Sequence, residues 1–282
     1  MTLTLGALLA EVTKRLQAVD IPSARLDARL LVGHVLELSK TQLFAYPERP
    51  ITDEETAKVE AVITRREARE PVSHILGRRE FWSLDFAVTA DTLDPRPDTE
   101  TLIEAVLAAV PEREARLKIL DFGTGTGCIP LTLLSELPNA RALAVDVSAA
   151  ALAVARKNAE SLGLSTRMAF MEGNWGEGLA GGFDIITSNP PYIPDAEVET
   201  LEPEVAKWEP RGALAGGTDG LDCYRALAPD IARLLLPGGL AALEVGMGQH
   251  DDVAAIMIQA GLSLREVKAD LAGIGRVVVL TR

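Results

Sequence analysis

Cysteine and histidine are both scarce in this chain of 282 residues, which has two cysteines and three histidines. Neither Cys128 nor Cys223 belongs to a CxxC pair, and His34, His74 and His250 are scattered without the HExxH spacing. A disulfide framework and a zinc site both need several such residues at short, regular spacings. We therefore expect no disulfide scaffold and no bound metal.

Positive charge is also scarce. The chain has 28 lysines and arginines against 41 acidic residues, a formal net charge of −13. Non-specific binding of nucleic acid depends on Lys and Arg displacing phosphate counterions, so this balance disfavours nucleic acid as a partner. The most basic local cluster is Arg65, Arg66 and Arg69. Because Glu67 and Glu70 lie beside it, we expect a solvated helix face there.

Long apolar runs are missing, although hydrophobic residues make up 48% of the chain. No uninterrupted run approaches the length of about 20 residues that a membrane-spanning helix needs. The first residues, MTLTLGALLAEVTKRL, place charges between leucines at helical spacing, which predicts an amphipathic helix and not a signal peptide. The composition therefore predicts a cytoplasmic protein with a substantial hydrophobic core and no membrane partner.

The first part of the chain predicts helices only. Apolar residues recur at helical spacing over residues 5–16 and 26–35. Thr52-Asp53-Glu54-Glu55 has the capping-box pattern, and the helix that it opens should end near Pro71. We expect residues 1–74 to form a helical N-terminal domain.

A short linker should follow this domain. Alternating apolar residues from Trp82 to Val88 predict a strand or one arm of a hairpin. The segment Leu93–Asp98 contains two prolines that flank one residue, so it cannot form regular structure. We place a hairpin linker at residues 75–95.

Strands and helices alternate over residues 96–282. Helices are expected between most of the strands, notably at 149–162 and 219–236. This pattern predicts an α/β fold with a mostly parallel, seven-stranded, Rossmann-like sheet flanked by helices, whose last two strands form a hairpin at the edge. The expected strands are 118–122, 142–147, 167–171, 184–188, 240–245, 262–267 and 276–281.

A glycine-rich turn, Asp121–Cys128 (DFGTGTGC), follows the first of these strands. Glycines there let the backbone approach a ligand closely. The dinucleotide fingerprint GxGxxG needs a glycine at position 128, and the Walker A sequence GK[ST] is absent, so a nicotinamide cofactor and a nucleoside triphosphate are both disfavoured. The second strand ends at Asp146, about 20 residues beyond the glycines, where an acid can accept hydrogen bonds from ribose hydroxyls.

This combination resembles the class I S-adenosylmethionine-dependent methyltransferases. The resemblance implies that S-adenosylmethionine is the cofactor and S-adenosylhomocysteine the product, with Asn174-Trp175 at the position that contacts adenine. A glycine-rich turn alone also occurs in α/β proteins without a cofactor, and the order of strand, turn, helix and acid-tipped strand favours the binding site. The expected cofactor contacts are Asp121, Gly123, Thr124, Gly125, Thr126, Gly127, Asp146, Asn174, Trp175 and Asn189.

The fourth strand is followed by Ser188–Ile193 (SNPPYI), at the sheet edge where open α/β sheets bind ligands. An amide nitrogen is a poor nucleophile because its lone pair is delocalised. Two fixed acceptors, the side-chain oxygen of Asn189 and the carbonyl of Pro190, can take both of its N–H bonds and aim the lone pair at a methyl group. The prolines keep these acceptors rigid, and the ring of Tyr192 can cover the planar amide. The alternative is an ordinary turn ended by prolines.

The NPPY tetrapeptide resembles the motif of amino-methyltransferases that act on adenine, cytosine or glutamine. Four other stretches resemble the peptide chain release factor N(5)-glutamine methyltransferases, and the similarity extends over nearly the whole chain. They are 78–84 (RREFWSL), 93–100 (LDPRPDTE), 209–214 (EPRGAL) and 216–221 (GGTDGL).

This resemblance implies methylation of the glutamine in the Gly-Gly-Gln tripeptide of class I release factors, which supports translation termination. It also implies that the N-terminal domain helps to dock the release factor and that the hairpin lies near the substrate pocket. The implied catalytic residues are Asn189, Pro190 and Tyr192. The implied substrate contacts are Asn189, Pro190, Pro191, Tyr192, Phe81 and Arg96.

Three other functions are compatible with parts of the pattern. An adenine or cytosine methyltransferase of nucleic acid shares NPPY, but the charge of −13 disfavours it. A methyltransferase of a ribosomal-protein glutamine usually differs at the RPDTE stretch. A cofactor-binding scaffold without catalysis is disfavoured because NPPY is intact. Asp94 and Gly275 depart from the family pattern at positions outside NPPY.

Overall fold

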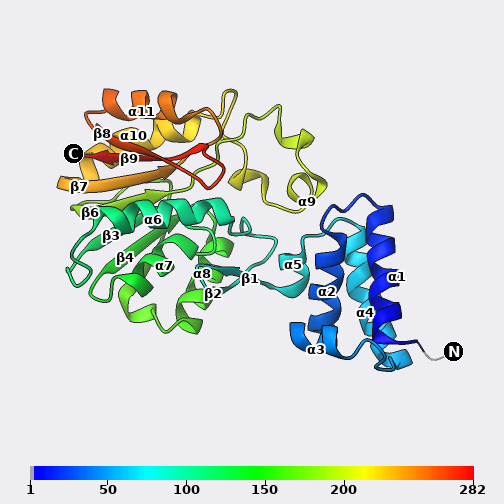
Figure 1. Ribbon diagram of the computed structural model, residues 1–282. Coiled ribbons are helices and arrows are strands. Elements are labelled where there is room, and N and C mark those ends of the chain that lie inside the picture. Colours follow the sequence, from blue (N-terminus) through cyan, green and yellow to red (C-terminus); the bar gives the residue numbers. More distant parts are fainter. Residues whose placement is uncertain (1–2) are drawn as a thin grey trace. The chain divides into compact units, whose positions relative to one another are not determined.

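The computed structural model describes residues 3–282 (Figure 1). Contacts divide the chain into two compact units. The first contains the residues up to Arg78 together with Pro203–Trp208, and the second contains Arg79–Glu202 and Glu209–Arg282. Among the described residues, no helix is both long and apolar enough to cross a membrane.

The first unit is helical, and α1, α2 and α4 pack against one another (Figure 1). The capping box predicted at Thr52 is present, because the Thr52 hydroxyl accepts a hydrogen bond from the Glu55 N–H at 3.2 Å. The leucines and valine at helical spacing in α1 are the residues that it buries in the core of this unit. Its helices are α1 (Leu5–Ala18), α2 (Ala24–Val35), α3 (Lys40–Ala45), α4 (Asp53–Glu67), α5 (Val72–Leu76) and α9 (Pro203–Ala206).

We predicted a solvated helix face at Arg65, Arg66 and Arg69. This prediction is wrong for Arg66, which is only 4% exposed. Its guanidinium donates to Asp27 at 2.8 Å and to Glu204 at 2.8 Å. A buried guanidinium needs partners of opposite charge, and both partners come from distant parts of the chain. The local sequence, with acids only at neighbouring positions, could not indicate them.

A two-stranded hairpin consists of β1 (Arg78–Phe81) and β2 (Leu84–Ala87). Trp82 and Ser83, at its tip, have φ values of 53° and 59°. A two-residue turn with two positive φ angles matches the twist of the flanking strands. The expectation that the arm begins at Trp82 is therefore corrected: this residue forms the turn, and the arm begins at Leu84. The turn lacks the Asn or Gly that usually indicates this conformation.

The second unit contains a seven-stranded sheet in the order β5-β4-β3-β6-β7-β9-β8. The strands from β5 to β7 are parallel, and β9 runs antiparallel to both of its neighbours. Each of the seven predicted strands is present, and the predicted fold class is confirmed. The strands are β3 (Lys118–Phe122), β4 (Arg141–Asp146), β5 (Met168–Glu172), β6 (Phe183–Ser188), β7 (Leu235–Glu244), β8 (Ser263–Ala269) and β9 (Gly275–Thr281).

Helices cover both faces of this sheet, with an apolar core on each side. The helices α6 (Glu100–Ala109), α7 (Cys128–Glu136) and α8 (Ala149–Ser161) pack on one face, and α10 (Asp222–Leu234) and α11 (His250–Gln259) pack on the other (Figure 1). Short 3-10 turns complete the unit: η1 (Pro97–Thr99), η2 (Ser165–Arg167), η3 (Val198–Thr200) and η4 (Arg211–Ala213).

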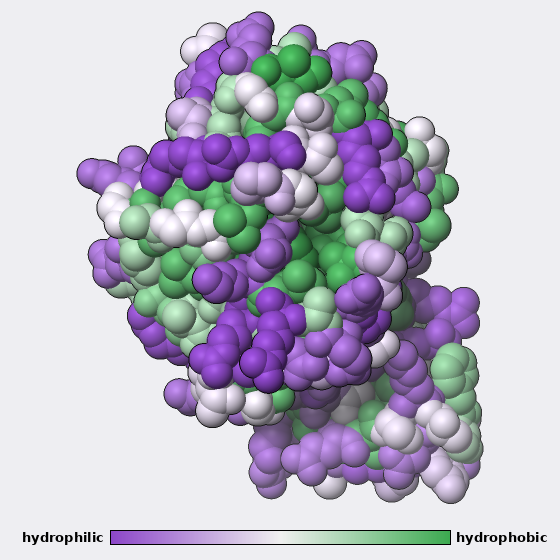
Figure 2. Space-filling view, turned by 90° about the vertical axis from the view of Figure 1, so that its left-hand side faces the viewer, coloured by the Kyte–Doolittle hydropathy of each residue, from purple (hydrophilic) through white to green (hydrophobic). Residues whose placement is uncertain are grey.

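The strand order reverses between β3 and β6, because the chain builds β4 and β5 on one side of β3 and then returns to its other side. At such a switch point, the loops that leave the carboxyl ends of the strands diverge and open a crevice. On the face that Figure 2 shows, polar and apolar residues are interspersed, and apolar residues are visible between the polar ones.

Candidate functional site

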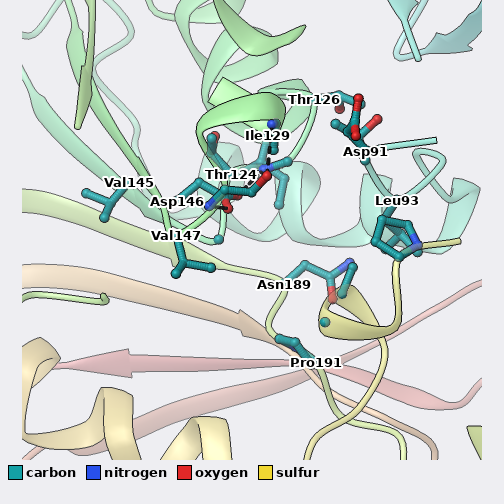
Figure 3. A pocket seen from close by; sticks show the side chains of 18 of the residues that line it. Asp91, Leu93, Thr124, Thr126, Ile129, Val145, Asp146, Val147, Asn189 and Pro191 are labelled. Atoms are coloured by element: carbon teal, nitrogen blue, oxygen red, sulfur yellow. Dashed lines mark hydrogen bonds between the residues drawn. The ribbon is translucent and has the colours of Figure 1, made fainter. Parts of the chain in front are cut away.

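A cavity of about 300 Å³ lies at this switch point, within the second unit. In Figure 3, Thr124 and Asp146 lie on one side of the cavity, and Asn189 and Pro191 lie on the other. The loops after β3, β4, β5 and β6 all contribute to its wall, as the parallel topology requires. The residues that were predicted from the sequence and line it are Arg96, Gly123, Thr124, Gly125, Thr126, Asp146, Asn174, Trp175, Asn189 and Pro191.

The glycine-rich loop between β3 and α7 has a backbone that other residues adopt poorly. Gly123, Gly125 and Gly127 have φ values of 65°, 54° and 78°. A Cβ atom on Gly125 would project into open space, whereas one on Gly127 would lie 3.1 Å from the side chain of Leu131 and 3.2 Å from that of Ala155. Gly125 thus leaves room at the cavity, and Gly127 permits close packing of the loop on the helices.

Asp146, at the end of β4, is tied to this loop. One carboxylate oxygen accepts a hydrogen bond from the Gly125 N–H at 2.9 Å, and the other accepts one from the Ser148 N–H at 2.9 Å. A carboxylate has more acceptor sites than these two bonds occupy. Asp146 can therefore shape the loop and still accept hydrogen bonds from a ligand in the cavity.

Apolar groups flank the same side of the cavity. Trp175 has a φ of 49°, and its ring meets Phe122 edge-to-face with centroids 6.4 Å apart. Val147, which was not predicted from the sequence, lines the cavity and is 75% exposed. An exposed valine and an anchored indole beside an acidic hydrogen-bond acceptor suit a flat heterocycle attached to a sugar.

Asp121 does not line the cavity but lies buried near the start of the loop. Thr187 donates a hydrogen bond to it at 2.6 Å. Burial raises the pKa of Asp121 to about 7. Gly127, Pro190 and Tyr192 are likewise absent from the cavity lining.

The Asn189–Tyr192 loop is held by contacts with distant backbone. The N–H of Ile193 donates to the Leu214 carbonyl at 3.0 Å, and the Gln249 side chain donates to the Tyr192 carbonyl at 2.9 Å. The side-chain nitrogen of Asn189 donates to the Thr99 hydroxyl at 3.3 Å. This bond turns the amide nitrogen of Asn189 towards Thr99 and leaves its oxygen as the acceptor for another partner. Burial raises the pKa of the Tyr192 phenol to about 12, so the ring stays neutral.

Arg96 lines the cavity, but its guanidinium is paired. It donates to Glu209 at 3.1 Å, and the other oxygen of Glu209 accepts the Asp94 N–H at 3.1 Å. Burial raises the pKa of Glu209 to about 7, although Arg96 opposes this shift. The pair fixes the turn before α6 against the segment that contains Glu209. Asp94 is itself buried, with the Arg79 guanidinium 4.0 Å away.

Phe81 is 2% exposed and packs edge-to-face on Phe86, with centroids 6.2 Å apart. The structure thus places it in the hydrophobic core and not at the cavity. Sequence reasoning missed Thr99 and Glu209, although both lie in stretches that resembled a known family. It also missed Glu244. This acid directly follows the apolar run Leu240–Leu243, and that position was a signal that could have identified it.

No group of three or more His, Cys, Asp or Glu side chains among residues 3–282 could hold a metal ion. The residues that line the cavity supply hydrogen-bond acceptors, backbone groups and apolar walls.

Two family models match this chain. That of the PrmC N-terminal domain matches residues 7–77, and that of the methyltransferase small domain matches residues 90–204. A release factor glutamine methyltransferase of Rhodospirillum rubrum is 51% identical over 280 residues, which cover 99% of this chain and 86% of that protein. One of Agrobacterium fabrum is 45% identical over 282 residues, which cover 99% of this chain and 98% of that protein.

Two solved structures share the fold. The ribosomal protein L11 methylase from Lactobacillus delbrueckii subsp. bulgaricus has a TM-score of 0.51 at 15% identity, with 68% of this chain and 81% of that chain covered. A methyltransferase from Pyrococcus furiosus has a TM-score of 0.51 at 19% identity, with 79% of this chain and 96% of that chain covered. At such identities the similarity concerns the fold alone.

Proposed function

The chain belongs to the release factor glutamine methyltransferase family, and we propose that it methylates the side-chain amide nitrogen of the glutamine in the Gly-Gly-Gln motif of class I release factors. The methyl donor is S-adenosylmethionine and the product is S-adenosylhomocysteine. The observation that favours this function most is the position of Asn189, whose side chain lines the cavity beside the glycine-rich loop with its nitrogen bonded to Thr99.

The residues of the cavity fit this cofactor. Asp146 is the acceptor for the ribose hydroxyls, the open space at Gly125 admits the methionine portion, and Val147 and Trp175 flank the adenine. Asn174 contributes to the wall at the same end. The cofactor, when bound, supplies a methyl group on a positively charged sulfur. Hydrogen bonds from the N–H groups of Gly125 and Ser148 to Asp146 hold the site in shape before the ligand arrives.

Two acceptors orient the substrate amide. The side-chain oxygen of Asn189 and the carbonyl of Pro190 take its two N–H bonds, which directs the nitrogen lone pair at the methyl carbon. A carbon–nitrogen bond forms, the carbon–sulfur bond breaks, and one N–H proton is released. Prolines 190 and 191 lack N–H donors, so neither residue can compete for the acceptors. The neutral ring of Tyr192 stands beside the planar amide.

The partner is a class I release factor, and the reaction takes place in the cytoplasm. The helical first unit contributes to docking, since one active-site loop cannot by itself recognise a whole protein. The acidic balance of the chain, with 41 acidic residues against 28 basic ones, disfavours nucleic acid as a substrate.

The test is a methyl-transfer assay with radiolabelled S-adenosylmethionine. The substrates are a release factor, the same factor with Gln→Glu in the tripeptide, and duplex DNA. We expect label on the first substrate only. Label on DNA, or equal label on the Gln→Glu factor, would show that the proposed substrate is wrong. Asn189→Ala enzyme, purified in parallel, controls for contaminating methyltransferases.

A further inference from the structure

A buried acid ends the strand next to Asn189. Glu244 is the last residue of β7 and is 1% exposed. In the parallel pairing of β6 with β7, Ser188 lies opposite Leu243. Asn189 directly follows β6 and Glu244 ends the neighbouring strand β7, so the two residues lie next to each other in the register, at the edge where the cavity opens.

Thr99 connects these two side chains. It is 2% exposed, and its hydroxyl accepts the hydrogen bond from the Asn189 nitrogen at 3.3 Å. Hydrogen bonding by the side chains of Thr99 and Asn189 lowers the pKa of the Glu244 carboxyl, against the effect of burial. One of its oxygens, Oε2, has no hydrogen-bond partner among the described residues. Thr99 and Asn189 line the cavity, and Glu244, which does not line it, is buried beside them.

We propose that Glu244 is a positioning residue, which together with Thr99 holds the Asn189 amide in the one orientation that presents its oxygen to the substrate. The inference rests on the proposed role of Asn189 as an acceptor. An ionised carboxylate can only accept hydrogen bonds, so it attracts the NH₂ group of Asn189 and repels its oxygen. If the amide rotated, the Asn189 oxygen would face the Glu244 carboxylate in a buried place, which is unfavourable. The Asn189 NH₂ group would then point at the substrate, where an acceptor is needed.

The protonation state of Glu244 decides whether this restraint acts. Burial raises its pKa to about 7, against the hydrogen bonds from Thr99 and Asn189. When protonated, the carboxyl can donate to the oxygen of Asn189, so the rotated amide is no longer excluded. Turnover should therefore rise with pH through about 7.

Charged and titratable groups surround Glu244 from other elements. Arg276 favours its charged form and Asp98 disfavours it, and the guanidinium of Arg276 lies 3.4 Å from the Asp98 carboxylate. The Tyr224 hydroxyl donates to the Glu244 backbone carbonyl at 2.7 Å and not to its carboxyl. The titratable and charged groups that face it are Asp98, Cys128, Tyr192, Tyr224 and Arg276.

Glu244→Gln and Thr99→Val remove this restraint while keeping the shape of the side chains, and Thr99→Ser retains the hydroxyl. We expect kcat to fall about 10- to 100-fold in the first two variants, since a misdirected acceptor affects the reacting geometry. We expect Thr99→Ser to recover most of the loss. The Kd of S-adenosylmethionine should stay within about threefold, because none of these changes removes a proposed cofactor contact.

The pH profile separates positioning from a structural role. In the parent enzyme, kcat should rise through about pH 7, and in Glu244→Gln this step should be absent. Asp121→Asn removes another buried acid whose pKa is about 7, and it should keep the step. The pKa of Glu244 is higher in the folded state than in the unfolded chain, so the folded state holds the proton more strongly. The stability that this proton contributes is present at low pH and is lost as the pH rises through about 7. Glu244→Gln should therefore have a Tm at pH 8 at least as high as the parent, which excludes misfolding as the cause of lost turnover.

Unchanged kcat in both Glu244→Gln and Thr99→Val, with the parent pH profile, would overturn the inference. Asn189→Ala is measured in the same series, so that a failure of this inference can be distinguished from a failure of the proposed function. If Asn189→Ala abolishes turnover while the other two variants do not affect it, only the positioning role is wrong. If Asn189→Ala is fully active, the role of Asn189 as an acceptor is itself wrong.

Discussion

The two sides of the cavity are built in different ways. On the glycine-loop side, backbone N–H groups of Gly125 and Ser148 hold Asp146, and all three lie between β3 and the start of α8, within a few tens of residues. On the other side, Asn189 is held by Thr99, 90 residues away in the sequence, and both neighbour Glu244 at the end of β7. One side depends on local backbone geometry, and the other depends on a buried cluster of side chains from distant segments.

This difference should separate the kinetic constants. A rigid backbone pocket determines how tightly the cofactor binds, whereas a set of oriented acceptors acts on the nitrogen as it reacts. Substitutions on the first side should therefore change cofactor affinity, and substitutions on the second should change turnover. Each of the following variants tests this division. A variant on the cofactor side that lowered kcat, or one on the acceptor side that weakened cofactor binding, would contradict it.

Asn189→Ala should have the largest effect. It removes the acceptor that we propose orients the attacking nitrogen, and removal of one such preorganised polar group lowers kcat by about 100- to 1,000-fold in comparable sites. Cofactor affinity, measured by isothermal titration calorimetry, should change by less than about threefold. A large loss of affinity with kcat preserved would place Asn189 on the cofactor side instead.

Asp146→Ala should weaken cofactor binding and largely preserve turnover. It removes the proposed acceptor for the ribose and releases the Gly125 and Ser148 N–H groups. Hydrogen bonds to a charged group contribute about 1.5 to 3 kcal/mol, so the cofactor Kd should rise by about 10- to 100-fold. At saturating cofactor, kcat should remain within a few-fold of the parent. Asp146→Asn, which keeps one acceptor oxygen, is the matched control and should lose less affinity.

The glycines of the loop allow a finer comparison within one side. Alanine at either Gly125 or Gly127 is strained by about 1 to 2 kcal/mol because both φ angles are positive. Only Gly127→Ala also adds contacts of 3.1 and 3.2 Å with Leu131 and Ala155. Gly127→Ala should therefore lower Tm more, and Gly125→Ala should weaken cofactor binding more. Thermal unfolding and calorimetry measure the two effects separately, and the opposite order would contradict the roles assigned to these glycines.

The same difference explains how much the sequence could predict. The β3 strand, the glycine loop and Asp146 follow one another along the chain, so their local pattern predicted both the fold class and the cavity wall. The loop Ser188–Ile193 was found in the same way, because its unusual prolines directly follow the apolar strand β6. Features that neighbours in the sequence determine were therefore accessible.

Features that depend on distant partners were not. Nothing near Arg66 indicated Asp27 or Glu204, which neutralise it in the core of the first unit. Likewise, Thr99 gains its role from a side chain 90 residues away. Hydrogen bonds between remote segments depend on the tertiary arrangement, which a local pattern of apolar and polar residues does not specify. The hairpin turn at Trp82 is a different case, since the tertiary fold imposes two positive φ angles on residues that rarely adopt them.

Phe81 provides the smallest and most specific test. The resemblance to a known family implied that it touches the substrate, whereas the structure places it in the core against Phe86. Phe81→Leu removes part of a buried side chain and leaves a small cavity, so it should destabilise the fold by about 1 to 2 kcal/mol. If the residue acts only in the core, KM for the release factor and kcat should both match the parent at temperatures well below Tm. A rise in KM with an unchanged Tm would instead mean that this ring contacts the substrate, and that the substrate side of the cavity extends to the hairpin.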